Sequence, residues 1–166
     1  AKDKNQLDII NLKTELAETY CKMRYFDYAE KPLEDVLLFY KNEKESDKNT
    51  LVYLLEKFGD YFIKNHDAEW AFELYEECLA IREAKLGQEH LEVIKLLDKI
   101  SIHYFEKDNY ELAKKGFLKL LIIDEKKYGP EHPAVVRLLL KLIPIYLLLR
   151  EFMEDENALE RLLALE

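Results

Sequence analysis

The sequence predicts an all-α protein built from four helical hairpins, and three observations lead to this prediction. A 42-residue period runs through the chain, the apolar residues follow helical spacing, and turn-forming residues are scarce, with four Gly and four Pro in 166 residues. Because 49% of the residues are hydrophobic, the chain has enough material for a substantial helical core. We therefore expect helices packed on helices and no β-sheet.

The period is visible in a loop sequence that occurs twice. Residues 86–91 read LGQEHL and residues 128–133 read YGPEHP, so that Gly87 and Gly129 lie 42 residues apart (129 − 87). A fixed period of this length is typical of stacked helical repeats. We expect one repeat domain over residues 1–166, cut from a larger protein. Its repeats, numbered one to four, are 5–46, 47–88, 89–130 and 131–166.

The first half of each repeat shows helical spacing. Residues one period apart share their character in three columns, which lie four residues apart within a repeat and therefore on one helical face. The columns are Leu12, Leu54, Leu96 and Leu138, then Leu16, Phe58, Ile100 and Leu142, then Tyr20, Phe62, Tyr104 and Tyr146. We expect this face to be the core face of the first helix.

The second half of each repeat predicts a second helix, which follows a short polar joint such as residues 106–109. Alanines begin it, and leucines eight residues later continue the same face: Ala29, Ala71 and Ala113, then Leu37, Leu79, Leu121 and Leu163. Small residues in the first helix (Ala17, Gly59, Ser101) mark the points where the two helices are expected to cross closely. One hairpin cannot bury both of its apolar faces, so we expect the repeats to stack.

The order Ser101, Tyr104, Tyr110, Ala113 resembles the tetratricopeptide repeat (TPR). The 42-residue period and the sequence AIREAKLGQEH at 80–90 more closely resemble the kinesin light chain type of that repeat. The resemblance implies a right-handed superhelical solenoid whose first helices line a concave groove. It also implies a protein-protein interaction module, acting as a scaffold or adaptor. We do not expect an enzyme, because no constellation of catalytic residues is present in the sequence.

Two features depart from the family pattern. Kinesin light chains carry paired Asn on the groove wall, whereas the matching pairs here are Glu-Lys at 56–57, Asp-Lys at 98–99 and Leu-Lys at 140–141, so we do not transfer the cargo specificity. Pro144 lies inside the expected first helix of repeat four, where a proline costs about 3 kcal/mol, and it predicts a kink or a shifted register. Pro32 raises the same question in repeat one.

A stripe beside the core face of each first helix, here called the groove face, holds the candidate binding residues. In repeats two to four they are Tyr53, Lys57 and Lys64, then Lys95 and Lys99, then Arg137 and Lys141. Repeat one instead has Asn11, Glu15, Glu18 and Lys22 on this face, so the groove is expected to be acidic at its start. Basic residues recurring within an acidic protein predict binding of an extended peptide that is acidic or ends in a carboxylate. The competing interpretation is a solvated face, with Glu56 and Asp98 neutralising the adjoining lysines.

Other partners are disfavoured. The formal charge of −9 disfavours nucleic acid, and the most apolar stretch, 134–149, is too short and too charged to insert in a membrane. The two cysteines form no metal-binding or disulfide pattern, which indicates reduced thiols, so we expect a cytoplasmic protein. We expect no metal and no cofactor: His90 and His132 occupy equivalent loops and predict a role at a turn and helix start. Cys78 occupies an inward-facing position, and no nucleotide-binding, hydrolase or zinc-protease motif is present.

A second function remains open at the C-terminal end. Four leucines lie close together in repeat four: Leu159, Leu162, Leu163 and Leu165. A leucine-rich terminal helix without a polar cap leaves an apolar face that needs cover. The alternative prediction is therefore a structural oligomerisation segment that self-associates through these residues.

Overall fold

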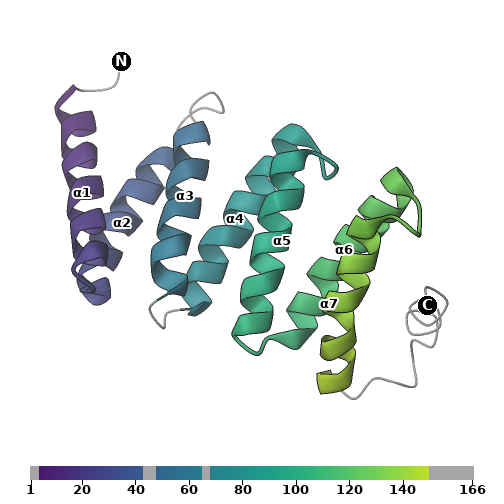
Figure 1. Ribbon diagram of the computed structural model, residues 1–166. Coiled ribbons are helices and arrows are strands. Elements are labelled where there is room, and N and C mark those ends of the chain that lie inside the picture. Colours follow the sequence, from purple (N-terminus) through teal and green to yellow (C-terminus); the bar gives the residue numbers. More distant parts are fainter. Residues whose placement is uncertain (1–3, 43–47, 65–67, 150–166) are drawn as a thin grey trace. The chain divides into compact units, whose positions relative to one another are not determined.

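The computed structural model describes residues 4–42, 48–64 and 68–149, and these residues form seven α-helices without a β-strand (Figure 1). The helices are α1 (Lys4–Lys22), α2 (Phe26–Lys41), α3 (Lys48–Ile63), α4 (Ala68–Leu86), α5 (Leu91–Glu106), α6 (Tyr110–Tyr128) and α7 (Pro133–Leu149). The predicted all-α helical-repeat fold is thereby confirmed. The second helix expected in repeat four lies outside the described residues. The chain divides into two compact units, Ala1–Lys85 and Leu86–Glu166, which are described separately below.

The first compact unit contains the hairpins α1–α2 and α3–α4, and α3 packs on both α1 and α2. The predicted crossing residues Ala17 and Ala29 are fully buried where α1 meets α2. The predicted core face of the first helix is wrong for α1, however, because Leu12 is 65% exposed and Leu16 is 43% exposed. Their equivalents are buried in the later repeats, and no described hairpin precedes α1.

The hairpin α3–α4 is held by a close crossing at Gly59. A Cβ atom at this position would lie 2.7 Å from the Tyr75 ring, so only glycine lets the ring of α4 reach the backbone of α3. The Tyr75 hydroxyl group donates a hydrogen bond to Asp60 Oδ1 at 2.6 Å, which fixes the ring over Gly59. Cys78 is fully buried on α4, as its inward-facing sequence position predicts.

The second compact unit contains α5, α6 and α7, and α6 packs on both of its neighbours. Ser101 and Ala113 are buried at the crossing of α5 and α6, as predicted. The Ser101 hydroxyl group donates to the Leu97 carbonyl oxygen at 2.7 Å, so this polar side chain is satisfied inside the core. Opposite it, Gly116 leaves room for the hydroxyl group, because a Cβ atom there would collide with the Ser101 side chain.

Pro32 lies inside α2 and Pro144 lies inside α7, and each helix continues beyond its proline. Each proline frees the carbonyl group four residues earlier, which belongs to Tyr28 in α2 and to Leu140 in α7. These two residues are 67% and 57% exposed, so the freed carbonyl groups lie on sides of the helices that water reaches. The register shift expected around Pro144 is absent, because the three α7 members of the apolar columns remain buried: Leu138, Leu142 and Tyr146.

The repeated loop has the same function at the start of α5 and of α7. Gly87 and Gly129 adopt φ values of 87° and 88°, in the left-handed region that favours glycine. His90 Nδ1 then accepts a hydrogen bond from the Glu92 N–H, and His132 Nδ1 accepts one from the Ala134 N–H, both at 3.2 Å. Each histidine satisfies a free N–H of the first helical turn, which confirms the predicted role at a helix start.

Candidate functional site

A recess of about 420 Å³ lies along α3, and it collects the three binding residues predicted in repeat two. Its lining residues are Tyr53, Glu56, Lys57, Asp60, Tyr61 and Lys64. Tyr53 is 59% exposed, so much of its ring is available to a partner. The Lys57 ammonium group lies 5.5 Å from the centre of this ring, within the range of a cation-π interaction. We call this feature the α3 recess.

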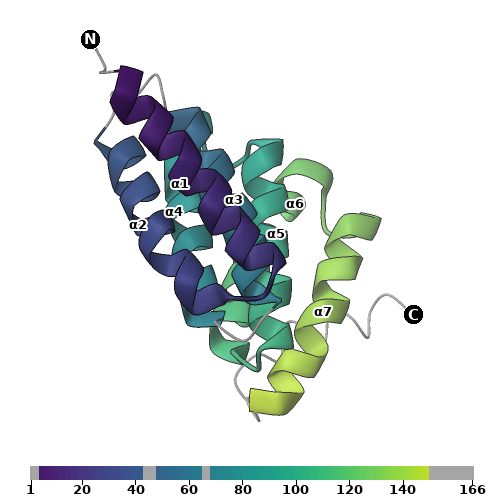
Figure 2. The same cartoon turned by 90° about the vertical axis from the view of Figure 1, so that its left-hand side faces the viewer.

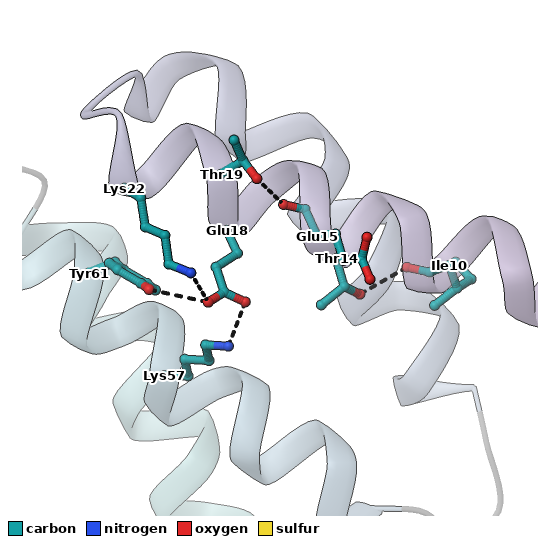
Figure 3. A network of polar contacts seen from close by, with 8 residues as sticks. All are labelled: Ile10, Thr14, Glu15, Glu18, Thr19, Lys22, Lys57 and Tyr61. Carbon is teal, nitrogen blue, oxygen red and sulfur yellow. Dashed lines mark hydrogen bonds and ion pairs between the residues drawn. The ribbon is translucent and has the colours of Figure 1, made fainter.

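Glu18 of α1 is the centre of a polar network beside the recess (Figure 3). Its carboxylate accepts hydrogen bonds from Lys57 Nζ at 2.6 Å and from the Tyr61 hydroxyl group at 3.5 Å. Lys22 Nζ of the same helix lies 2.8 Å from the carboxylate. The hydrogen bonds from Lys22 and Lys57 hold the pKa of Glu18 below its usual value. The network therefore ties the first hairpin to the second through a charged pair.

Lys57 is consequently charged and already paired. Burial works to lower its pKa, but the hydrogen bond and negative charge of Glu18 outweigh burial and raise it. The side chain is 25% exposed, so its ammonium group can still be reached from the recess. One interpretation of the sequence was that Glu56 neutralises Lys57. In the structure Lys57 pairs with Glu18, and Glu56 pairs with Arg82 of α4 at 2.8 Å.

The α3 recess is balanced in charge. Its lining contributes two carboxylates, Glu56 and Asp60, and two ammonium groups, Lys57 and Lys64. Both carboxylates are engaged by α4, through Arg82 and through the Tyr75 hydroxyl group. Burial, followed by the hydrogen bond to Asp60, raises the pKa of Tyr75 far above its usual range, so Tyr75 stays a hydrogen-bond donor. The recess thus offers aromatic and hydrogen-bonding contacts without an excess of positive charge.

The second compact unit carries the other four predicted binding residues. Lys141 Nζ of α7 donates to Asp98 Oδ1 of α5 at 2.8 Å, and it lies 5.1 Å from the centre of the Phe117 ring. Asp98 therefore pairs with a lysine of the next repeat. The remaining residues are Lys95 and Arg137, which are exposed, and Lys99, which is half-buried. The groove face of this unit therefore carries four basic residues, of which Lys141 is paired with Asp98.

Within residues 4–42, 48–64 and 68–149, no group of three or more His, Cys, Asp or Glu side chains is placed to hold a metal ion. None of the seven described helices is long and apolar enough to cross a membrane. The thiols of Cys21 and Cys78 are buried in the core, and burial together with the charge of Glu18 raises the pKa of Cys21 to about 11. The predicted self-association residues, Leu159, Leu162, Leu163 and Leu165, lie outside the described residues.

Sequence and structure comparisons show which known repeats this chain resembles. Residues 65–92, which cover α4 and the following loop, match the family model of the tetratricopeptide repeat. The helices described above also share the fold of TPR-like repeats in known structures. No curated protein sequence matches the chain significantly.

Two crystal structures show which type of repeat the chain resembles. One contains the nearly identical TPR-like repeats of a provisionally assigned kinesin light chain from Podosopora anserina, with 21% identity and a TM-score of 0.59. The match covers 93% of this chain and 74% of that one. The other is BtubC (BKLC) from P. vanneervenii, with 18% identity and a TM-score of 0.54, covering 97% of this chain and 65% of that one. The predicted resemblance to kinesin light chain repeats is confirmed.

Proposed function

We propose that this chain is an interaction module that binds an extended segment of a partner protein along the groove faces of its first helices. The observation that carries the proposal is the α3 recess, which brings Tyr53, Lys57 and Lys64 to one surface. An exposed aromatic ring beside an ammonium group suits a peptide, because the ring packs on side chains while the ammonium group binds a carbonyl or carboxylate.

The two compact units contribute different chemistry to this proposal. The balanced recess of the first unit favours aromatic and hydrogen-bonding contacts with a peptide. The second unit carries Lys95, Lys99, Arg137 and Lys141 on its groove face, and these basic residues favour a carboxylate. The second unit by itself therefore favours an extended peptide that is acidic or ends in a free carboxylate.

The test uses fluorescently labelled acidic peptides with either a free or an amidated C-terminus, and measures their affinity for the full chain by anisotropy. The double variant Lys95→Glu, Arg137→Glu is expected to weaken binding about tenfold, because two exposed attractive charges become repulsive. Binding should also weaken as salt rises, since exposed charges are screened.

The matched control for this experiment is Lys115→Glu, which reverses an exposed charge on α6, a second helix. It changes the net charge of the same compact unit without touching the groove face, so binding should be nearly unchanged. Equal losses in the control and in a single Lys95→Glu variant would show that only net charge matters. That result would contradict a groove-face site.

A further inference from the structure

The Glu18 carboxylate is bound in the way that a carboxylate of a partner would be. Three donors surround it: Lys57 Nζ at 2.6 Å, Lys22 Nζ at 2.8 Å and the Tyr61 hydroxyl group at 3.5 Å. Figure 3 shows these side chains pointing toward Glu18 from two helices, Lys22 from α1 and the other two from α3. Ammonium groups bind carboxylates through strong, charge-assisted hydrogen bonds. The first compact unit therefore contains a carboxylate-binding position that one of its own side chains fills.

This carboxylate-binding position adjoins the α3 recess. Glu18 lies where α1 contacts α3, and Figure 2 shows α1 passing in front of α3. Two of its donors, Lys57 and Tyr61, also line the recess. Glu18 is 23% exposed and both of its oxygens accept hydrogen bonds, Oε2 from Lys57 and Oε1 from Tyr61. A carboxylate that entered the recess would therefore meet donors that are already in use.

The other charged groups of the recess do not form a second position of this kind. Glu56 and Asp60 are acids themselves, and they are held by Arg82 and by the Tyr75 hydroxyl group of α4. Lys64 is the remaining ammonium group of the lining, and it is exposed just after the end of α3. A single solvated ammonium group contributes little to the binding of a carboxylate. The recess thus disfavours an acidic side chain relative to a neutral one.

We propose that Glu18 is a built-in competitor, which keeps carboxylates of a bound partner out of the α3 recess and makes the recess select an uncharged part of the bound segment. This inference rests on the groove-face function proposed above and adds a determinant of specificity to that site. An acid in the recess would lose hydration without gaining an unoccupied donor, and Glu18 would repel it. Replacing Glu18 by a neutral side chain would release its three donors together for a carboxylate of the ligand.

A purely structural role of Glu18 predicts a different result. If Glu18 only joined α1 to α3, its removal would loosen the recess and weaken the binding of every peptide. If Glu18 competes with the ligand, its removal strengthens the binding of acidic peptides and leaves neutral peptides unaffected. The affinity for an acidic peptide should therefore rise even though the chain becomes less stable.

The test uses two fluorescent extended peptides that differ only in carrying Glu or Gln at alternate positions, and anisotropy measures their affinity for the full chain. Glu18→Gln is expected to bind the Glu peptide about fivefold more tightly than the unchanged chain does, because attraction replaces repulsion. Its affinity for the Gln peptide should stay the same. The double variant Glu18→Gln, Lys57→Gln should lose the gain, because one released donor is then missing. Circular dichroism checks that each variant is folded.

The matched control is Glu15→Gln, which removes the same charge from the same helix one turn earlier. Glu15 is exposed, and its backbone carbonyl oxygen, which accepts a hydrogen bond from the Thr19 hydroxyl group at 2.8 Å, is kept in the variant. Its affinity for the Glu peptide should change little. Equal affinities of Glu15→Gln and Glu18→Gln for the Glu peptide, including no binding to either, would overturn the proposal.

A second measurement uses the unchanged chain. Acetylation of Lys57 by an amine-reactive ester, followed by mass spectrometry, reports whether a bound peptide covers this ammonium group. The Glu peptide should protect Lys57 no better than the Gln peptide does, and better protection would also overturn the proposal. The variant Lys95→Glu, Arg137→Glu and its control Lys115→Glu test the groove-face function separately, so the failure of one proposal can be told from the failure of the other.

Discussion

The hairpins α3–α4 and α5–α6 reach the same close crossing with opposite arrangements of side chains. In α3–α4 the first helix provides glycine, Gly59, and the second provides the large ring of Tyr75. In α5–α6 the first helix provides Ser101 and the second provides glycine, Gly116. The difference teaches that the repeat fixes the space available at the crossing, while either helix can supply the side chain that fills it.

The ion pairs between successive first helices show the same division between common and local features. Lys57 and Lys141 occupy equivalent positions, 84 residues or two periods apart, and each pairs with an acid of the preceding first helix. The acids are not equivalent, because Glu18 lies 39 residues before its lysine and Asp98 lies 43 residues before its own. The repeat places the lysine, and the local sequence places its partner within one helical turn.

The largest effect is expected at the crossing of α5 and α6. Gly116→Ala should destabilise the chain by about 2 kcal/mol, because the added methyl group collides with Ser101 and overpacks a buried site. The second change Ser101→Gly should restore most of this loss by transferring the glycine to the first helix, as in α3–α4. Urea unfolding of the two single variants and the double variant measures the coupling. Additive free energies of unfolding would show that the two positions do not share one space.

A smaller loss of stability is expected when the ion pairs of Glu18 and Asp98 are removed, and its size should differ between the two. Glu18→Gln should lower the free energy of unfolding by about 1 kcal/mol, because it weakens contacts with Lys22, Lys57 and Tyr61 at once. Asp98→Asn should lower the free energy of unfolding by about half as much, since the Asp98 carboxylate accepts its hydrogen bond from Lys141. Glu111→Gln, at an exposed pair within α6, is the control and should change stability least. An equal loss of unfolding free energy in all three variants would show that the ion pairs between helices contribute no more than an exposed pair within one helix.

The smallest effect is the pH dependence that Glu18 confers on stability. Its folded-state pKa lies below the ordinary value of 4.5, so its stabilising contribution is fully present above that value. The contribution is lost as pH falls through the folded-state pKa, because protonation then removes the charge that binds Lys22 and Lys57. Thermal unfolding between neutral pH and about pH 3 should therefore show a shallower acid loss for Glu18→Gln than for the unchanged chain. An identical loss of thermal stability with falling pH in the variant and the unchanged chain would contradict the assignment of this pH dependence to Glu18.

The columns of residues 42 apart predicted the helical hairpins, the crossing residues and the histidines at the helix starts, because these features depend on short segments that recur in each repeat. The columns failed at Leu12 and Leu16, since burial of a first helix requires a hairpin in front of it. The partners of Lys57 and Lys141 were also missed. Stacking joins acids and lysines from different repeats, and their separations of 39 and 43 residues do not equal the period.

The prolines of α2 and α7 have a mechanical consequence. A helix that lacks one internal hydrogen bond bends more easily at that turn, and bends away from the proline ring. Pro32 and Pro144 therefore give α2 and α7 one weakened turn each, whereas α3 to α6 contain no internal proline. Each compact unit thus contains one helix with such a turn. Bending of α2 or α7 under load from a bound partner is expected to concentrate at that turn, away from the crossings at Gly59 and Gly116.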